Sequence, residues 1–524
     1  MMTKINNINR MRLFKAGGRL VLTIVFSLLF PLSSFLFSSC HNASVPTQYT
    51  DIRKAPPIYP DYTDVTIPVN IAPLTFELDD SCDEIVARFT VDDYQLVCGG
   101  KAVQPEMDDW RELVSKAVGK KDIDVEVFVR LDQEWWRYQP FHITVSPDSI
   151  DPYISYRLIS PSYVAYEELT LNQRCLENYD EKVMVNNMLC GKETTGQCVN
   201  CHNYQMYNPQ RMQFHARQFH GGTVIAYDGK LRKINMRNDS ILSAGVYPAW
   251  HPWLPLIVYS TNKTSQSFHT RNINKIEVFD AVSDLIAYDV TKNEVTNLEN
   301  AEDEFEVFPV WAPDGKTIYY CSAHFEFRDT IPHDNEVISR YREVKYNIYK
   351  KSFDPDTYQF GPRELVFQAD SLDKSATLPR VSPDGRYLVF TMGHYGVFHI
   401  WHREADLYLL DLTNGEVRAM DEINSPETES YHAWSSNGRW MVFSSRRYDG
   451  SYTRPFFAHI DADGKGSKPF ELPQADPDYH RQFMKCYNIP EFMLGPVEVS
   501  PQEFASVLKA SDGDPVKYVP KLTK

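Results

Sequence analysis

Four segments of the chain share one pattern of apolar and polar positions. In each, a short strand-like run is followed by a turn and then by a second run of β-branched and aromatic residues. Two of the turns are Pro-Asp-Gly, at residues 313–315 and 383–385, and another is Asn437-Gly438. Gly accepts a positive φ at no steric cost, so these turns predict β-hairpins. The four segments are 247–260, 308–322, 378–391 and 431–445.

The repeated hairpins indicate an all-β fold. A further strand-like run follows each hairpin, as at 284–290 and 406–412. These units resemble the TolB-like β-propeller family, whose blades carry Trp-Ser-Pro-Asp-Gly followed by a Phe-x-Ser strand. The resemblance covers roughly residues 220–475 and implies a propeller of five or six blades. An all-β sandwich with four similar hairpins is the alternative.

A different pattern precedes the repeats, in residues 73–170. Runs such as 86–91 and 123–130 alternate with period two, which is typical of half-buried strands. The run from Trp110 to Val118 is more helical, and Gly119 would end it. We therefore expect a small β-sandwich-like domain before the propeller.

The N-terminus has the pattern of an export signal. Residues 1–19 carry basic and no acidic side chains, and a mostly apolar run extends from Leu20 to Phe37. Ser38-Ser39 then precedes Cys40, which resembles the bacterial lipobox, where the cysteine is acylated and becomes the first residue of the mature chain. An uncleaved membrane helix is the alternative, but Pro31 and the serines argue against it.

The residue after Cys40 bears on location. It is His41 rather than Asp, which implies the outer membrane by the sorting rule of the enterobacterial family. We expect a lipid-anchored protein that faces the periplasm of a Gram-negative bacterium. The expected parts are a signal peptide (1–39), an anchor and tether (40–72), an N-terminal β-rich domain (73–170), a loop and helix segment (171–222), the propeller (223–490) and a C-terminal tail (491–524).

The charge of the chain limits its partners. The formal net charge is −16 at pH 7, and residues 1–39 contribute only positive charges to it. Nucleic acids are bound by clustered Lys and Arg, so no nucleic acid is expected. Anionic lipid is disfavoured for the same reason, and membrane attachment would depend on acylated Cys40. The remaining expected partner is a protein of the cell envelope.

The strongest chemical motif is Cys198-Val199-Asn200-Cys201-His202, the Cys-x-x-Cys-His attachment motif of c-type haem. Two thiols can add to the two vinyl groups of one porphyrin, and the following His then ligates the iron. The export signal agrees with this, since haem is attached covalently outside the cytoplasm. We expect one haem c, thioether-bound to Cys198 and Cys201 with His202 as proximal ligand. It would serve electron transfer or redox or haem sensing, with a redox partner docked on the propeller.

Two other chemistries fit the same cysteines. Cys198 and Cys201 can form a disulfide or redox pair in which His202 is incidental. They can also bind zinc together with His215 or His220. Under these alternatives the protein is a non-redox interaction scaffold of the TolB kind.

The sixth position on the iron has two candidates. Residues 210–219 are predicted as a short helix begun by Pro209, which would place Met212 and His215 on one face. We expect His215 to ligate, because imidazole is the stronger donor to ferric iron. A thioether ligand from Met212 is the competing possibility and would raise the reduction potential.

Several runs together carry a second resemblance. They are 150–159, 198–202, 212–215 and 221–223. They are similar to a family of exported TolB-like proteins from anaerobic Gram-negative bacteria, often labelled cytochrome c-type or cytochrome c biosynthesis proteins. The resemblance covers most of the mature chain and implies a shared architecture, but it adds little about the physiological role.

Motifs of common enzyme classes are missing from the sequence. It contains no Gly-x-Ser-x-Gly, no His-Glu-x-x-His and no phosphate-binding loop. His394, His399 and His402 suggest a metal site, but solvated or stacking histidines are favoured over it. A binding or electron-transfer role is therefore expected rather than an enzymatic one.

Overall fold

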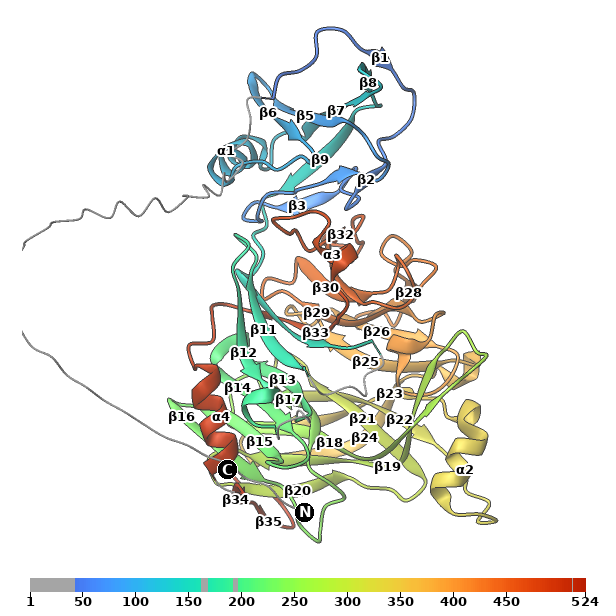
Figure 1. Cartoon of the computed structure of the whole chain (residues 1–524). Helices are drawn as coiled ribbons and strands as arrows, with labels where there is room; N and C mark the ends of the chain where they lie inside the picture. Colours follow the sequence, from blue (N-terminus) through green and yellow to red (C-terminus); the bar gives the residue numbers. More distant parts are fainter. Residues whose placement is uncertain (1–42, 162–167, 192–196, 511) are drawn as a thin grey trace, which may run out of the picture. The chain divides into compact units, whose positions relative to one another are not determined.

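A computed structural model describes residues 43–161, 168–191, 197–510 and 512–524. The predicted signal peptide and Cys40 lie outside these residues. The described chain is built mainly of strands (Figure 1). No helix within these residues is both long enough and apolar enough to cross a membrane.

The N-terminal strands form one seven-stranded sheet with a helix packed on it. Alternation along the central strands directs Phe89 and other apolar side chains toward Trp110 of the helix, and the two rings meet edge to face at 6.1 Å. The elements are β1 (Thr50–Asp51), β3 (Thr66–Pro68), β5 (Glu84–Val91), β6 (Tyr94–Gly100), α1 (Met107–Ala117), β7 (Ile123–Leu131), β8 (Glu134–Arg137) and β9 (Phe141–Ser146), with β2 (Ile58–Tyr59) and β4 (Glu77–Leu78) as a separate pair.

Residues 58–72 belong to this core rather than to a tether. Tyr62, Val65 and Ile67 are buried among its apolar side chains, and β3 pairs in parallel with β9. The predicted tether is therefore wrong in its second half. Its apolar residues are too irregularly spaced to show a period, and they are buried through long-range packing.

The four sequence repeats form four-stranded antiparallel units arranged as blades of a propeller (Figure 1), which confirms the predicted propeller architecture. They share one register: Trp250 pairs with Ile257, Trp311 with Ile318, Val381 with Leu388 and Trp434 with Met441. A parallel pairing of Ser283 with Phe305 joins the first two units. The strands, in chain order, are β17 (Val246–Trp250), β18 (Leu256–Phe268), β19 (Ile276–Asp289), β20 (Glu294–Glu299), β21 (Glu304–Trp311), β22 (Thr317–His324), β23 (Asn347–Asp354), β24 (Gln359–Phe367), β25 (Ser375–Val381), β26 (Tyr387–Gly393), β27 (Asp406–Asp411), β28 (Val417–Ala419), β29 (Glu429–Trp434), β30 (Trp440–Ser445), β31 (Arg454–His459) and β32 (Phe470–Glu471).

Two further antiparallel sheets contain the segment that was predicted to be loop and helix. One has the strand order β13-β14-β15-β16, and the other has the order β33-β10-β11-β12. The loop and helix prediction for residues 171–222 is therefore wrong. The strands are β10 (Tyr153–Ile159), β11 (Thr170–Cys175), β12 (Glu181–Asn186), β13 (Val199–Gln205), β14 (Asn208–Ala216), β15 (Gly222–Tyr227), β16 (Lys230–Asn235) and β33 (Cys486–Met493).

The C-terminal residues are integrated into the fold rather than forming a tail. β33 pairs with β10, with Met493 opposite Tyr153. Phe504 of α4 packs edge to face on Phe214 at 5.3 Å. The short strands β34 and β35 extend β16 and β20 in parallel. The prediction of a tail over 491–524 is therefore wrong. The remaining elements are α2 (His333–Arg340), α3 (Tyr479–Gln482), α4 (Pro501–Ala510), β34 (Asp514–Pro515) and β35 (Lys517–Tyr518).

Candidate functional site

One strand in each of six four-stranded antiparallel units contains a bulge with a left-handed residue. At each bulge the ladder skips residues, and a non-glycine side chain adopts a positive φ, a conformation that L residues adopt uncommonly. These six side chains line one small cavity of about 30 Å³. They are Cys201, Tyr247, Phe308, Leu378, Tyr431 and Ile489, which we call the bulge ring.

The cysteine motif therefore occupies a repeated structural position. Cys201 is its member of the bulge ring, and His202 stands where Pro248, Pro309, Pro379, His432 and Pro490 follow the other members. His432 belongs to a blade without a cysteine motif, and its Nε2 donates to the carbonyl oxygen of Val389 at 2.9 Å. Burial lowers the pKa of both His202 and His432 to about 3. Both imidazoles are thus neutral groups buried between sheets.

The arrangement of the motif does not fit a haem. Cys198, Cys201 and His202 are 5%, 3% and 1% exposed, and the cavity beside them holds about 30 Å³. A site for a cofactor-sized ligand has about 300–1,000 Å³. The motif also runs into β13, which pairs with β14 through residues on both sides of the bulge. A porphyrin at this place would require β13 to leave its sheet. Haem attachment stays a prediction from the motif alone.

The two alternatives for the cysteines find little support in the geometry. Cys198 and Cys201 are both free thiols, and burial raises the pKa of Cys201, which disfavours the thiolate that binds metals. His215 is hydrogen-bonded through Nδ1 to the Thr223 hydroxyl at 3.1 Å. Across the described ranges, no group of three His, Cys, Asp or Glu side chains is arranged to hold a metal.

The predicted sixth ligands do not share a face. Residues 208–216 form strand β14, so the expected helix is wrong, and Met212 and His215 point to opposite sides because side chains alternate along a strand. Met212 is buried in the main core, and burial lowers the pKa of His215 to about 3. Strand pairing overrides the local helix propensity here, because β14 pairs with β13 on one side and with β15 on the other.

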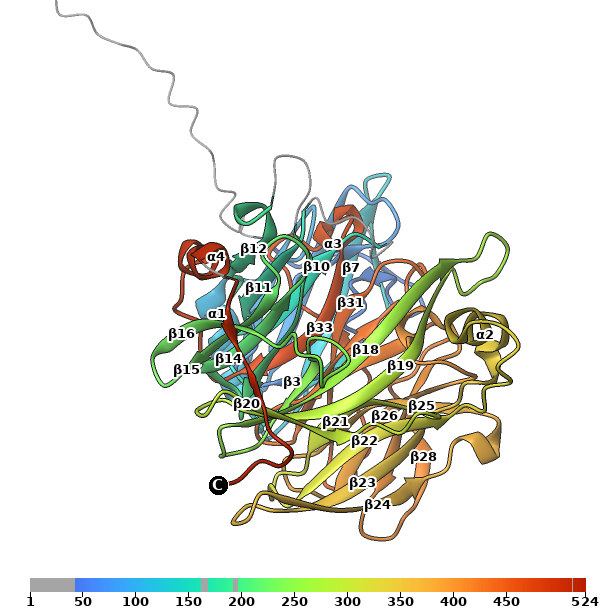
Figure 2. The ribbon, with the colours of Figure 1, turned by 90° about the horizontal axis from the view of Figure 1, so that it is seen from below.

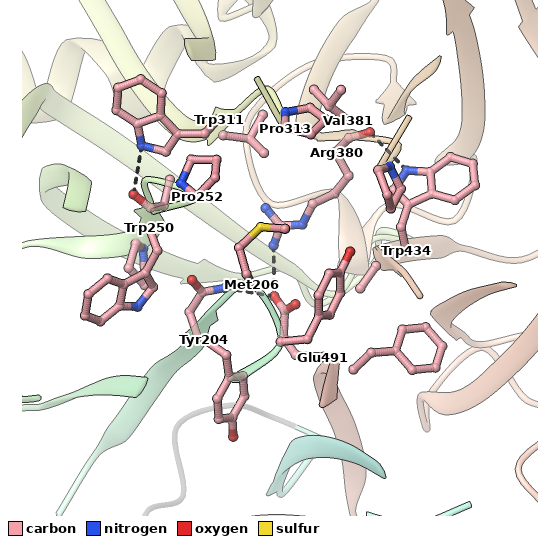
Figure 3. Close-up of a pocket in the computed structure, with 18 of the residues that line it drawn as sticks. Tyr204, Met206, Trp250, Pro252, Trp311, Pro313, Arg380, Val381, Trp434 and Glu491 are labelled. Carbon is pink, nitrogen blue, oxygen red and sulfur yellow. Dashed lines mark hydrogen bonds and ion pairs between the residues drawn. The ribbon is translucent and has the colours of Figure 1, made fainter. Parts of the chain in front are cut away.

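A larger cavity of about 150 Å³ lies beyond the bulge ring (Figure 3). It lies at the ends of the six strands that carry the bulges, which we call the inner strands. The positions two residues after the bulge ring form its inner wall. Three of them are polar, namely Asn203, Arg380 and Glu491. Arg380 Nη2 lies 3.2 Å from Glu491 Oε1, and the Asn203 amide donates to the same oxygen at 3.4 Å. Burial raises the pKa of Glu491, while Arg380 acts against this. The other three positions are Ala249, Val310 and Ala433.

The Trp side chains of the repeats hold the wall of this cavity in place. The indole N–H of Trp311 donates to the carbonyl oxygen of Ala249 at 3.2 Å, and that of Trp434 donates to the carbonyl oxygen of Arg380 at 3.2 Å. Each indole thus bridges to another blade's inner strand. Figure 3 shows the indoles turned outward, with the side chains of Met206, Arg380 and Glu491 between them.

The mouth of the cavity is apolar and exposed. Met206, at the β13–β14 turn, lines the cavity and is 50% exposed. Met206 and Pro252 also line an adjoining groove of about 440 Å³, together with Leu494. Leu494 is 55% exposed, and we call Met206, Pro252 and Leu494 the apolar rim. Singly exposed apolar residues are ordinary, but several around one cavity are typical of a binding surface.

Sequence reasoning did not single out this cavity. The only local signal was that Arg380 replaces the small apolar residues Ala249, Val310 and Ala433 of the other repeats. Glu491 and Asn203 lay outside the recognised repeats, so their approach to Arg380 followed only from the paired strands β33 and β13.

Comparison with known proteins gives no family. No family model matches the chain, and no curated protein matches it. An oligogalacturonate lyase in complex with manganese aligns over 62% of this chain and 74% of its own at 12% identity and a TM-score of 0.35. A DUF4784 family protein from Bacteroides caccae aligns over 69% and 94% at 8% identity and a TM-score of 0.26.

Prolyl oligopeptidase B from Galerina marginata aligns over 66% of this chain at 9% identity and a TM-score of 0.31. The aligned part spans 42% of that protein's length. All these values are too low to carry an argument about the function of this chain.

Proposed function

We propose that this chain is a lipid-anchored protein of the cell envelope, and that its propeller binds a partner protein at the cavity behind the apolar rim. In this proposal, acylated Cys40 holds the protein in the outer membrane and the folded part faces the periplasm. The role is docking rather than electron transfer, and the cysteine motif is part of the propeller core.

The proposal includes a propeller of six blades. Its support is the bulge ring, because β13 and β33 carry the same bulge as the four repeats. β33 comes from the C-terminal part of the chain and pairs with β10 from the N-terminal part. Such a shared blade would close the ring and fix the six inner strands around one axis.

The observation that carries the docking role is the combination of an apolar rim with a polar wall. A cavity of about 150 Å³ has room for roughly one aromatic ring. Side chains that anchor protein interfaces enter pockets of this kind, and exposed apolar residues around them exclude water. The Arg380 guanidinium has several N–H donors, so it can hold Glu491 and an acceptor of the partner together. A single inserted side chain with a polar end fits this chemistry.

The rim can be tested by site-specific photo-cross-linking in cells. A photoreactive residue placed at Leu494 should capture a discrete envelope protein, and one placed at Leu372 should not. Leu372 is a matched control, since it is 57% exposed against 55% for Leu494 and lies in another part of the fold.

A charge introduced on the rim by mutation supplies a second arm of the same test. Met206→Asp should abolish the cross-link from position 494, because a carboxylate would be buried at the mouth of the cavity without a partner. Capture of the same proteins from positions 494 and 372, or capture that Met206→Asp leaves unchanged, would contradict the docking site.

The anchor is tested separately. Cys40→Ser should release the protein from washed membranes, because the acylated thiol is the anchor in this proposal and no helix within the described residues is long and apolar enough to cross a membrane. Continued sedimentation of the variant with membranes would overturn this part of the proposal and leave the cavity untouched.

A further inference from the structure

The longest hairpin of the propeller reaches across to a loop of another blade. Strands β18 and β19 run side by side toward the part of the molecule that carries α2 (Figure 2). The end of the hairpin meets the loop between β26 and β27. There Asn274 Oδ1 accepts from the Arg403 backbone at 3.1 Å, and Asn274 Nδ2 lies 3.5 Å from Glu404 Oε2. This junction lies outside the cavity described above.

A buried glutamate of the hairpin is the centre of this junction. Glu277 Oε1 accepts from the Tyr395 hydroxyl at 2.8 Å, and Glu277 Oε2 lies 3.0 Å from His402 Nε2. Both oxygens of Glu277 thus face donor groups, and a carboxylate only accepts hydrogen bonds.

The carboxylate fixes the tautomer of His402. Because Glu277 can only accept, His402 Nε2 carries the proton, and in the neutral ring Nδ1 keeps its lone pair. His402 is 1% exposed, and its Nδ1 makes no hydrogen bond. A buried imidazole nitrogen with a bare lone pair is an unsatisfied acceptor in a protein core, and it is also the form of His that binds metals.

Two other side chains approach that lone pair. His402 Nδ1 lies 3.9 Å from Glu404 Oε1, and the same oxygen lies 3.3 Å from His394 Nδ1. Glu404 Oε1 is buried and has no hydrogen-bond donor. Glu404 Oε1 thus lies near both imidazole nitrogens. Ligand atoms at about 2.0–2.2 Å from a tetrahedral ion lie roughly 3.3–3.6 Å apart, so the distance from His394 to Glu404 fits and the distance from His402 to Glu404 must shorten.

We propose that His394 Nδ1, His402 Nδ1 and Glu404 Oε1 bind a divalent transition-metal ion of the zinc class, with Glu277 holding His402 from behind. Two imidazoles and a carboxylate are a zinc ligand set that leaves the fourth position for water. A ligating His commonly donates its other N–H to a carboxylate, as His402 does to Glu277. His399 takes no part, since its ring is bonded to Thr377 and to the Tyr395 carbonyl.

The exposed ligand supplies the last adjustment. In the part of the chain that is described, no three such side chains already surround one point. His394 is 56% exposed at the surface of the loop, so its ring can rotate about Glu404 toward His402 without disturbing the core. Binding would then fasten the β18–β19 hairpin, through Glu277, to the loop of the neighbouring strands β26 and β27.

The test is zinc binding by the mature chain after removal of metal with a chelator. We expect one equivalent of Zn²⁺ by isothermal titration, and a d–d spectrum without sulfur charge transfer when Co²⁺ replaces it. His394→Ala and Glu404→Gln should each weaken binding at least about 10-fold, because each removes a ligand. Glu277→Gln should weaken it about 10-fold through the orientation of His402.

The matched control is His142→Ala. His142 is 59% exposed and also faces a carboxylate, but it is hydrogen-bonded to Asp124 at 2.7 Å in the N-terminal domain. This variant should bind zinc like the unaltered chain. Three results would overturn the site: no bound zinc, equal loss in His142→Ala and His394→Ala, or loss in Cys198→Ser instead. The last result would move the metal to the cysteine motif.

Discussion

Strands β13 and β29 offer a direct comparison, because they have the same backbone but different side chains. Cys201 and Tyr431 both adopt a left-handed conformation, with φ of 56° and 49°. Each is followed by a buried histidine whose pKa burial lowers to about 3. Only β13 is preceded by a second cysteine, Cys198, which completes a haem motif. The position of His202 in its sheet is therefore enough to explain why this histidine is buried and neutral, and no haem is needed for that explanation.

The two strands differ in what fills the bulge ring. Tyr431 contributes an aromatic ring, whereas Cys201 contributes one sulfur atom. Elsewhere in the ring, Tyr247 and Phe308 meet edge to face at 4.5 Å. The ring thus mixes large and small side chains around one small cavity, and Cys201 is one of its smallest members.

The largest effect is expected when the aromatic member is removed. Tyr431→Ala should lower the free energy of unfolding by about 3 kcal/mol, because a buried ring leaves a hole at the centre of the propeller. Cys201→Ala should lower it by about 1 kcal/mol, as expected for a small buried apolar group. Chemical denaturation of both variants measures the difference. A cost for Cys201→Ala equal to that of Tyr431→Ala would indicate a role for the thiol beyond packing.

A smaller effect is expected at low pH from His202 and His432, the two buried histidines at equivalent positions of β13 and β29. Each has an ordinary pKa of 6.5 when unfolded and about 3 when folded. The unfolded chain therefore binds the extra proton between these values. The stability from each buried neutral ring is fully present above pH 6.5 and is lost as the pH falls toward 3. Between pH 7 and pH 4.5, each buried ring should therefore lower the free energy of unfolding by roughly 2–3 kcal/mol.

Replacement of either ring isolates its share of this loss. His202→Gln and His432→Gln should both flatten the fall of the denaturation midpoint between pH 7 and 4.5, and by similar amounts. A flattening seen in only one of the two variants would break the equivalence of β13 and β29.

Local features of the fold could be predicted from the sequence. The turns at Gly315, Gly385 and Gly438 adopt positive φ as their Asp-Gly and Asn-Gly sequences predict. The common register of Trp250, Trp311, Val381 and Trp434 likewise follows from short hairpins. These elements are determined by neighbours a few residues away, so a single sequence contains the information.

The site could be predicted much less well, because it depends on distant strands. Arg380 meets Glu491 only because β33 pairs with β10. These two strands come from parts of the chain that are more than three hundred positions apart. The bulge at Cys201 is imposed by pairing with β14, so a five-residue motif gave no sign of it. The spacing of Met212 and His215 suited a helix equally well, and only the strands on both sides of β14 decide against it.

Proline at position 202 is expected to have a still smaller effect. Four of the other five bulges have Pro at this position, and the β13–β14 ladder skips from Asn200 to Asn203. His202→Pro therefore removes no ladder hydrogen bond and should cost about 1 kcal/mol at pH 7. His215→Pro is the contrasting control, since His215 pairs with Asn200 and Thr223 inside the sheet. If both variants unfold alike, the two positions are not distinguished by the bulge.

The smallest expected effect concerns haem itself, where we expect none. A porphyrin on Cys198 and Cys201 would keep β13 out of a sheet in which Asn200 and Asn203 pair with β14. Cells with a complete cytochrome c maturation system should therefore yield a folded chain with no haem mass and no visible spectrum. Cys198→Ser with Cys201→Ser should give the same spectrum and nearly the same stability. The decisive contrary result is a mature chain that carries covalent haem and still unfolds like the haem-free propeller. That outcome would show that β13 can hold the cofactor within the sheet, and it would restore electron transfer over docking.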